Sequence, residues 1–179
     1  MPTPPASSAA ATRPADDEFA PYYGGYIALV PGGDVRDHLR QQLHETLATL
    51  TGVGDDVASR AYGPGKWTLK EVLSHICDAE RVFAYRLLRI ARGDETPLPG
   101  FEQDHWIPTS GANTRTLESL LIEFASVRAA TLTLLASLPD EAWARRGTAS
   151  GKPVSARALA YITAGHEKHH MRIIRERYL

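Results

Sequence analysis

Hydrophobic residues recur every three to four positions in four long segments of the chain, and the segments between them are rich in glycine, proline and polar residues. This spacing places the hydrophobic side chains on one face of an α-helix, so it predicts four amphipathic helices. We expect these helices over residues 35–50, 69–92, 115–138 and 156–178. The hydrophobic face of the second helix consists of Val72, Ile76, Ala79, Phe83, Leu87 and Ile90.

Capping signals support these boundaries. Thr68 and Glu71 form the pattern of a capping box ahead of the second helix, and Asp34 and Ser155 are N-cap candidates for the first and last helices. Strand signals are nearly absent; the polar segment 147–153 is expected to be a loop or a small hairpin. Four amphipathic helices with long connections predict an all-α fold, a four-helix bundle.

The first thirty residues divide into two parts. Residues 1–20 are rich in proline, alanine, serine and threonine and then become acidic, which predicts a flexible leader. Residues 21–30 contain three tyrosines and four aliphatic residues, so we expect this aromatic arm to pack on the bundle, either as a simple cover or with Tyr26 lining a pocket. Residues 21–179 are expected to form a single domain.

Charge and composition narrow the function classes. The chain has 20 Lys and Arg against 21 Asp and Glu, a formal net charge of -1, so it lacks the basic excess typical of nucleic-acid or membrane-surface binding. No apolar run approaches the roughly 18 residues of a membrane-spanning helix. Arg13 is the only basic residue near the N-terminus, without an apolar segment, so we expect no signal peptide. A single cysteine, Cys77, fits a reducing, cytoplasmic location.

Two histidines one helical turn apart, His166 and His170, lie in the last predicted helix. An i, i+4 pair shares one face, with Cβ atoms roughly 5–6 Å apart, which suits two imidazoles on one metal ion. They also fall on the hydrophobic face, where each unpaired buried polar group costs on the order of 1–3 kcal/mol. A shared cation would remove that cost, although satisfied core histidines remain the alternative. The neighbouring His169 lies off this face and is expected at the flank.

A catalytic metal site of this kind needs a third protein ligand. His75, on the edge of the second helix's hydrophobic face, is the first candidate, and Asp78 and Glu80 are alternatives. His38 and His44 are six residues apart on the first helix and are expected at the surface.

Residues 166–170 also match the H-E-x-x-H pattern of zinc proteases, in which Glu167 would be the general base. The surrounding sequence argues against this interpretation. Only nine residues follow His170 (179 − 170 = 9), and the extended protease pattern would need glycine at Ile173 and histidine at Glu176.

Longer motifs surround the histidines: GKWTLKEVLSH at residues 65–75 and GHEKHH at residues 165–170. Together with RVFAYR at 81–86 and RRGTASG at 145–151, they resemble the DinB/YfiT-like superfamily of metal-dependent enzymes. The similarity extends over roughly residues 20–179, which is nearly the whole chain outside the leader.

The resemblance implies an up-down-down-up four-helix bundle, often dimeric, in which three histidines hold a divalent metal ion. Nickel and zinc are the expected ions, with iron or manganese as alternatives. Carried over position by position, the ligands are His75, His166 and His170. Some members resemble hydrolases, and others are transferases or isomerases that use a low-molecular-weight thiol.

We therefore expect a metal-dependent enzyme that activates water or a thiol for attack on a small electrophilic substrate, in a cytoplasmic homodimer. Acid–base assistance is expected from Asp78, Glu80, Asp104 or Tyr26. Two other interpretations are a non-catalytic, stress-related metal-binding bundle and a partner-binding helical domain with structural histidines. An open coordination position beside a pocket would favour the enzyme.

Overall fold

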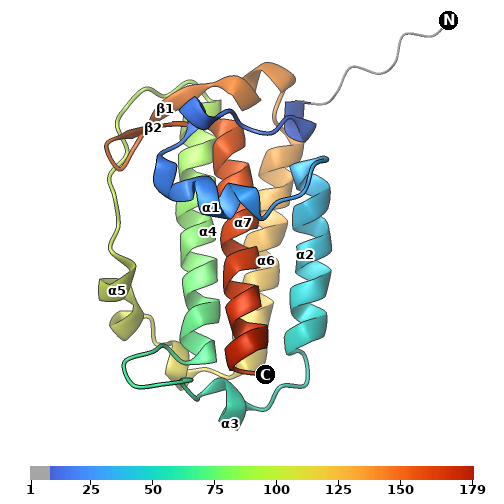
Figure 1. The fold of residues 1–179 in the computed structure, drawn as a ribbon, viewed down its shortest axis with the longest axis vertical. Coiled ribbons are helices and arrows are strands. Elements are labelled where there is room, and N and C mark those ends of the chain that lie inside the picture. Colours follow the sequence, from blue (N-terminus) through green and yellow to red (C-terminus); the bar gives the residue numbers. More distant parts are fainter. Residues whose placement is uncertain (1–8) are drawn as a thin grey trace, which may run out of the picture.

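The computed structural model describes residues 9–179, and its main feature is a bundle of four long helices (Figure 1). The four helices are α2 (Val35–Leu50), α4 (Leu69–Ala91), α6 (Leu117–Ala136) and α7 (Ala156–Arg177). Each end lies within two residues of the end predicted from the hydrophobic pattern. The expected all-α four-helix bundle is confirmed.

The order of directions is up-down-down-up, as predicted. Figure 1 shows α4 and α6 running in the same direction and α2 and α7 running the opposite way. Helix α4 packs against both α6 and α7, and α2 packs against the same two helices from the other side. Since α4 and α6 are parallel, residues 92–116 must return along the length of the bundle, and the short helix α5 (Gln103–Trp106) lies on this return (Figure 1).

Short elements complete the fold. Residues 146–155 form the antiparallel hairpin of β1 (Arg146–Ala149) and β2 (Lys152–Ser155), which confirms the hairpin interpretation of that segment. The remaining helices are α1 (Gly24–Ala28) and α3 (Asp55–Ala58), and the 3-10 turns are Ala9–Ala11, Asp16–Glu18, Pro21–Tyr23, Ile107–Thr109, Ala112–Thr114 and Asp140–Ala144.

The predicted caps fix where the long helices begin. Thr68 Oγ1 accepts a hydrogen bond from the Glu71 amide at 3.1 Å, and Glu71 Oε2 accepts one from the Thr68 amide at 2.8 Å, so the capping box is complete. Asp34 caps α2 and Ser155 caps α7 through the amide of Ala158. These bonds satisfy amides that have no partner within the helix.

The expectation of a flexible leader over residues 1–20 is wrong for residues 9–20, while residues 1–8 lie outside the described part. Ala10 and Phe19 are buried in the core, and the buried carboxylate of Glu18 accepts hydrogen bonds from Ser155 and Arg157 at 2.6 Å each. Burial alone would raise the pKa of Glu18, but these hydrogen bonds outweigh it and lower the pKa. Composition could not reveal this, because the partners lie more than 130 positions away.

Helix α6 corrects a second expectation. By length and composition it could cross a membrane, with a mean hydropathy of 1.5 over 18 residues, although charged residues interrupt its apolar sequence. In this fold it packs against α2 and α4, and Arg128 in its middle is fully buried. Within this fold, 39% of that 18-residue stretch is buried.

The core consists of two hydrophobic clusters, one toward each end of the bundle. On α4 the first cluster includes Phe83 and the second includes Ile76; on α7 they include Ile162 and Met171. Buried polar residues lie at the boundary between the clusters on all four helices: Gln42, Thr46, His75, Glu80, Arg128, His166 and Glu167. The middle of the bundle is therefore where its chemistry is concentrated.

Candidate metal centre

The structure brings the three predicted histidines together. His75 projects from α4, and His166 and His170 project from one face of α7, which packs against it. The Nε2 atom of His166 lies 3.0 Å from Nε2 of His75 and 3.1 Å from Nε2 of His170. One nitrogen from each ring lies within 4.8 Å of the others, which is a fitting arrangement for a shared metal ion.

The chemistry of the donor set fits a cation. A neutral imidazole has one N–H and one lone pair, so His166 Nε2 can complete a hydrogen bond with only one of its two neighbours. A metal ion would accept the lone pairs of all three nitrogens at once. His75 and His166 are only 2% and 5% exposed. The three histidines therefore fit a divalent metal.

Burial keeps these rings in the neutral form that binds metals. It lowers the pKa of His75 to about 4, against a smaller opposing effect of the Asp104 carboxylate, and lowers the pKa of His170 to about 3. The pKa of His166 is also lowered, first by burial and then by His170, His75 and His169. At neutral pH no proton has to be displaced from these nitrogens before a metal binds.

Aromatic side chains hold the rings in place. The ring of Trp67 packs 5.0 Å from that of His75, and Phe83 lies 5.6 Å from His166. His169 is half-buried beside His170, with ring centroids 5.1 Å apart, and is not part of the three-nitrogen cluster. It occupies the flanking position expected from the helix pattern.

Helix α1 of the aromatic arm crosses α7 (Figure 1), and its residue Tyr26 lies beside His166 of the cluster. A Cβ atom on Gly165 would lie 2.1 Å from the carbonyl oxygen of Tyr26, so the close approach of α1 to α7 requires glycine here. The contact places the Tyr26 ring 5.5 Å from His166. Gly165, the residue before the first histidine, is a positioning residue that sequence reasoning missed; its signal was a glycine inside an otherwise regular helix.

A cavity of about 250 Å³ opens beside the histidines. His75 and His166 form part of its wall, the arm contributes Tyr22, Tyr23 and Tyr26, and residues 102–104 close another side. Of the predicted acid–base residues, Asp104 and Tyr26 line this cavity. The arm is therefore more than a simple cover of the bundle, because Tyr26 lines a pocket.

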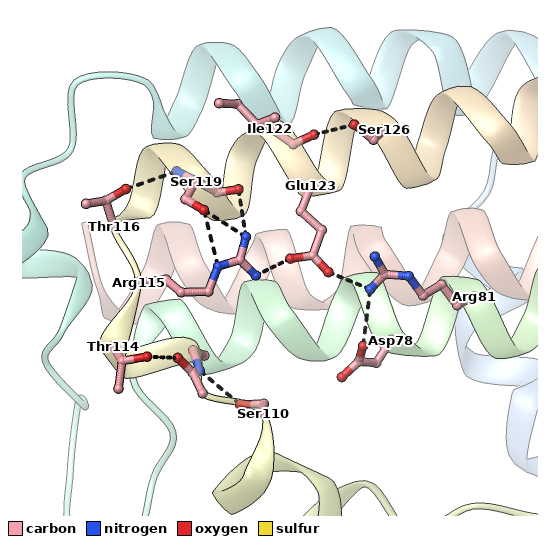
Figure 2. A network of polar contacts seen from close by, with 12 residues as sticks. Asp78, Arg81, Ser110, Thr114, Arg115, Thr116, Ser119, Ile122, Glu123 and Ser126 are labelled. Carbon is pink, nitrogen blue, oxygen red and sulfur yellow. Dashed lines mark hydrogen bonds and ion pairs between the residues drawn. The ribbon is translucent and has the colours of Figure 1, made fainter.

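Asp78 does not line the cavity beside the histidines, so the expectation that it gives acid–base assistance there is corrected. Its carboxylate accepts a hydrogen bond from Arg81 at 3.3 Å, and Arg81 also donates to Glu123 at 2.5 Å. Figure 2 shows this chain of ion pairs between α4 and α6, continued by Arg115 on the far side of Glu123. Asp78 follows His75 by three residues, and its carboxylate is committed to Arg81.

Glu80 is also separated from the cavity, because it belongs to a second buried cluster around Arg128. The guanidinium of Arg128 donates two hydrogen bonds to Glu80, at 2.9 and 2.8 Å, and one to Glu167 at 2.5 Å. A further bond of 2.9 Å reaches the Leu39 carbonyl. One side chain of α6 thus contacts the other three long helices.

Glu167 therefore does not act as the base of a zinc protease. Its second oxygen accepts a hydrogen bond from Thr46 at 2.6 Å, so both oxygens are used on the side of α7 facing α2 and α6. Burial raises the pKa of Glu167, against the opposing effect of Arg128. The H-E-x-x-H match is coincidental, as the surrounding sequence indicated.

Comparisons with known proteins agree with this fold and identify the family of the chain. A model of the DinB superfamily matches residues 38–174. A protein of Oceanobacillus iheyensis is 32% identical over 59 residues, which cover 32% of this chain and 34% of that protein. A protein of Geobacillus thermodenitrificans is 25% identical over 127 residues, covering 69% of this chain and 70% of that protein. Both are provisionally named metal-dependent hydrolases, and the chain spans about a third of the length of the first.

A solved structure shares the architecture. YfiT from Bacillus subtilis, described as a probable metal-dependent hydrolase with an unusual four-helix bundle topology, superposes with a TM-score of 0.67. The match covers 92% of this chain and 90% of that one at 16% sequence identity, which establishes the shared fold. Since the family model spans most of the sequence and the bundle matches, this protein belongs to the DinB superfamily.

Proposed function

We propose that this protein is a metal-dependent hydrolase in which His75, His166 and His170 hold one divalent ion. The convergence of three histidine nitrogens at the wall of a cavity carries the proposal. The provisional names of the two relatives support hydrolysis over thiol transfer. Nickel or zinc is the proposed ion and iron or manganese the alternative, because imidazole nitrogens suit all of these metals.

When bound, a divalent ion held by three neutral ligands supplies Lewis-acid activation of water at neutral pH. In the hydrolysis, the water oxygen bonds to the electrophilic carbon, the bond from that carbon to the leaving group breaks, and a water proton passes to the leaving group. We assign this proton transfer to Asp104, the carboxylate of the cavity that acts electrostatically on His75. Burial and the hydrogen bond with Tyr22 raise the pKa of Tyr26, so its hydroxyl stays protonated and can orient a substrate oxygen.

The non-catalytic alternative requires a closed coordination shell. Within residues 9–179, no carboxylate or thiolate joins the three nitrogens, and two of the three histidines line a cavity. Both observations favour an enzyme over a structural metal ion that only links the helices of the bundle. A low-molecular-weight thiol as co-substrate, a homodimer and a cytoplasmic location stay predictions.

Metal analysis of protein purified without a histidine tag tests the binding step. We expect about one equivalent of divalent metal per chain, and its loss in His75→Ala and His166→Ala. His44→Ala is the matched control, because His44 is an exposed histidine on α2. Substoichiometric metal in the wild type, unchanged in His166→Ala, would contradict the proposal.

Turnover is tested with a panel of small neutral esters and amides. Removing the metal with a chelator should abolish hydrolysis, and restoring nickel or zinc should recover it. Asp104→Asn should lower kcat with metal content unchanged, because the side chain is not one of the ligands. Metal-loaded protein that hydrolyses no member of a broad panel would favour the non-catalytic alternative.

A further inference from the structure

Ser150 has an unusual backbone conformation on the wall of the cavity beside the histidines. Within residues 9–179 it is the only residue other than glycine with a positive φ, at +52°, and Gly151 follows at +71°. Two such residues in succession, between β1 and β2, are typical of a type I′ turn, which favours asparagine, aspartate or glycine at this position. Serine is strained here, and a strained residue that persists in a fold is a candidate for a functional role.

Hydrogen bonds from the neighbouring chain hold this turn in place. The Ser150 amide donates a hydrogen bond of 3.0 Å to the Leu98 carbonyl, and the Leu98 amide donates one of 2.9 Å to the Thr148 carbonyl. The hairpin is thus tied to the return segment after α4, which continues into residues 102–104 at the cavity. Ser150 itself lines this cavity together with two of the three histidines.

A buried positive charge lies next to Ser150. The guanidinium of Arg86, which is only 2% exposed, donates a hydrogen bond of 3.1 Å to Ser150 Oγ and one of 2.6 Å to the Pro99 carbonyl. It also lies 5.6 Å from the ring centre of Phe101. No carboxylate of the described residues forms an ion pair with Arg86, so the serine hydroxyl is one of its two hydrogen-bond acceptors.

This contact determines how the hydroxyl group can act. A guanidinium only donates hydrogen bonds, so Ser150 Oγ accepts, and its own single proton is left for another acceptor. Among the described residues no group accepts that proton. A cationic donor on the oxygen also makes the hydroxyl a stronger donor itself. Because no imidazole or carboxylate contacts the hydroxyl to remove its proton, Ser150 is suited to donate a hydrogen bond rather than to act as a nucleophile.

On the basis of the hydrolase proposed above, we propose that Ser150 donates a hydrogen bond to the carbonyl oxygen of the substrate, and that Arg86 is the positioning residue that orients and polarises its hydroxyl. As the water oxygen bonds to the carbonyl carbon, the π electron pair of the C=O bond moves onto the carbonyl oxygen. Ser150 stabilises this charge and keeps its own proton. The electron pair then re-forms the carbonyl, the bond to the leaving group breaks, and the leaving group receives the water proton through Asp104. The substrate class is therefore a small ester or amide.

Removing the hydroxyl separates this role from a structural one. Ser150→Gly deletes the donor and relieves the strained conformation, because glycine adopts a positive φ freely. We expect this variant to keep its metal content and its unfolding temperature, while kcat on small esters falls at least about tenfold with little change in KM. Ser150→Ala, which removes only the hydroxyl, should lose kcat to the same extent.

Ser59→Gly is the matched control, because Ser59 is an exposed serine at the end of α3 that does not line the cavity. It should retain the kcat of the wild type. A kcat of Ser150→Gly within about twofold of the wild-type value would overturn the proposal, since loss of a hydrogen-bond donor to a developing negative charge has a larger effect.

A tetrahedral anion tests the same donor without turnover. The ethyl methylphosphonate anion resembles an ethyl ester during attack by water, whereas N-ethylacetamide is neutral and planar. Titration of the zinc-loaded, full-length protein followed by NMR should show that Ser150→Gly weakens phosphonate binding at least about fivefold and amide binding less than about twofold. Equal weakening of both probes, or no phosphonate binding by the wild type, would overturn the proposal.

A double-mutant cycle tests whether Arg86 acts through Ser150. Arg86→Met removes the cation and leaves no carboxylate unpaired, so the variant is expected to fold. It should weaken phosphonate binding about threefold when Ser150 is present and have no further effect in Ser150→Gly. Arg86→Lys, which keeps the charge, should recover part of this binding and provides a second variant for the cycle. Equal effects in both backgrounds would refute the positioning role.

Hydrolysis and binding together separate this proposal from the proposed function. Metal-dependent hydrolysis that is unchanged in Ser150→Gly would refute the role of Ser150 and leave the hydrolase intact. Phosphonate binding that depends on Ser150, without hydrolysis of any ester or amide, would support the donor and refute the hydrolase.

Discussion

Two buried polar clusters lie side by side in the middle of the bundle, and they differ in how their hydrogen bonds are satisfied. In the cluster around Arg128, both oxygens of Glu80 and of Glu167 accept hydrogen bonds from protein donors. In the histidine cluster, three neutral nitrogens face one another, and one nitrogen cannot complete hydrogen bonds with both neighbours. The hydrogen bonds of the first cluster are complete within the protein, whereas the nitrogen lone pairs of the second cluster require a partner from outside the protein, such as a metal ion.

The two clusters therefore have different roles within one layer of the core. The Arg128 cluster stabilises the packing of the helices, and the histidine cluster is the proposed functional site. Buried charged groups that satisfy each other fix how helices pack, and removing one leaves the others unpaired. Buried groups of one kind with lone pairs converging on a point fit a cation. His166 and Glu167 are adjacent in sequence, yet each belongs to a different cluster because successive helix positions point about 100° apart.

The largest expected effect comes from breaking the complete cluster. Arg128→Met should lower the free energy of unfolding by about 3–5 kcal/mol even without metal, because Glu80 and Glu167 would remain buried without a counter-charge. Urea denaturation of the metal-free protein measures this. Arg81→Met, which removes the half-exposed ion pairs of Figure 2, is the control and should cost under about 1 kcal/mol. A loss below about 1 kcal/mol for Arg128→Met would contradict the comparison.

The histidine cluster should behave in the opposite way. His75→Leu should change the stability of the metal-free protein little, because it replaces a buried polar ring by an apolar side chain of similar size. The added stability of the metal-loaded wild type, about 2.7 kcal/mol at a free metal concentration of 100 times Kd, should disappear in the variant. Thermal unfolding with and without nickel or zinc measures both. Equal stabilisation of wild type and variant by metal would show that the ion binds elsewhere.

Gly165 tests whether the arm depends on its close contact with α7. Gly165→Ala should cost about 1–3 kcal/mol and displace the arm, because the new Cβ would overlap the Tyr26 carbonyl. Displacement should appear as faster proteolysis within residues 21–30. Gly25→Ala is the control, since nothing lies within 4 Å of a Cβ there. Equal proteolysis of the two variants would refute this role of Gly165.

The histidine cluster should make the stability of the metal-free protein depend on pH. Histidine has an ordinary pKa of 6.5, and burial lowers the pKa of His75 to about 4 in the folded state. Between these values the unfolded chain binds more protons, so the free energy of unfolding should fall with decreasing pH, by at most about 1.4 kcal/mol per pH unit for each such histidine. Denaturation at a series of pH values measures the slope, which should be shallower in His75→Leu. Identical slopes would mean that His75 is not held neutral.

The sequence by itself determined the four helices, their caps and the pair His166 and His170, because these depend on periodicity and on contacts within a few residues. The helix pattern made His75 the first candidate for the third ligand, and the family resemblance selected it over Asp78 and Glu80 and supplied the order of helix directions. A local pattern shows which face of a helix is buried, but not which side chain from another helix meets it.

Only the tertiary structure decided the rest. It paired Glu80 with Arg128 and left Asp104 and Tyr26 at the cavity, and it anchored residues 9–20 through Glu18. Each of these outcomes depends on groups tens to more than a hundred positions apart, brought together by helix packing. The sequence specified which chemical groups are present, and the packing of the helices determined which of them are satisfied within the protein.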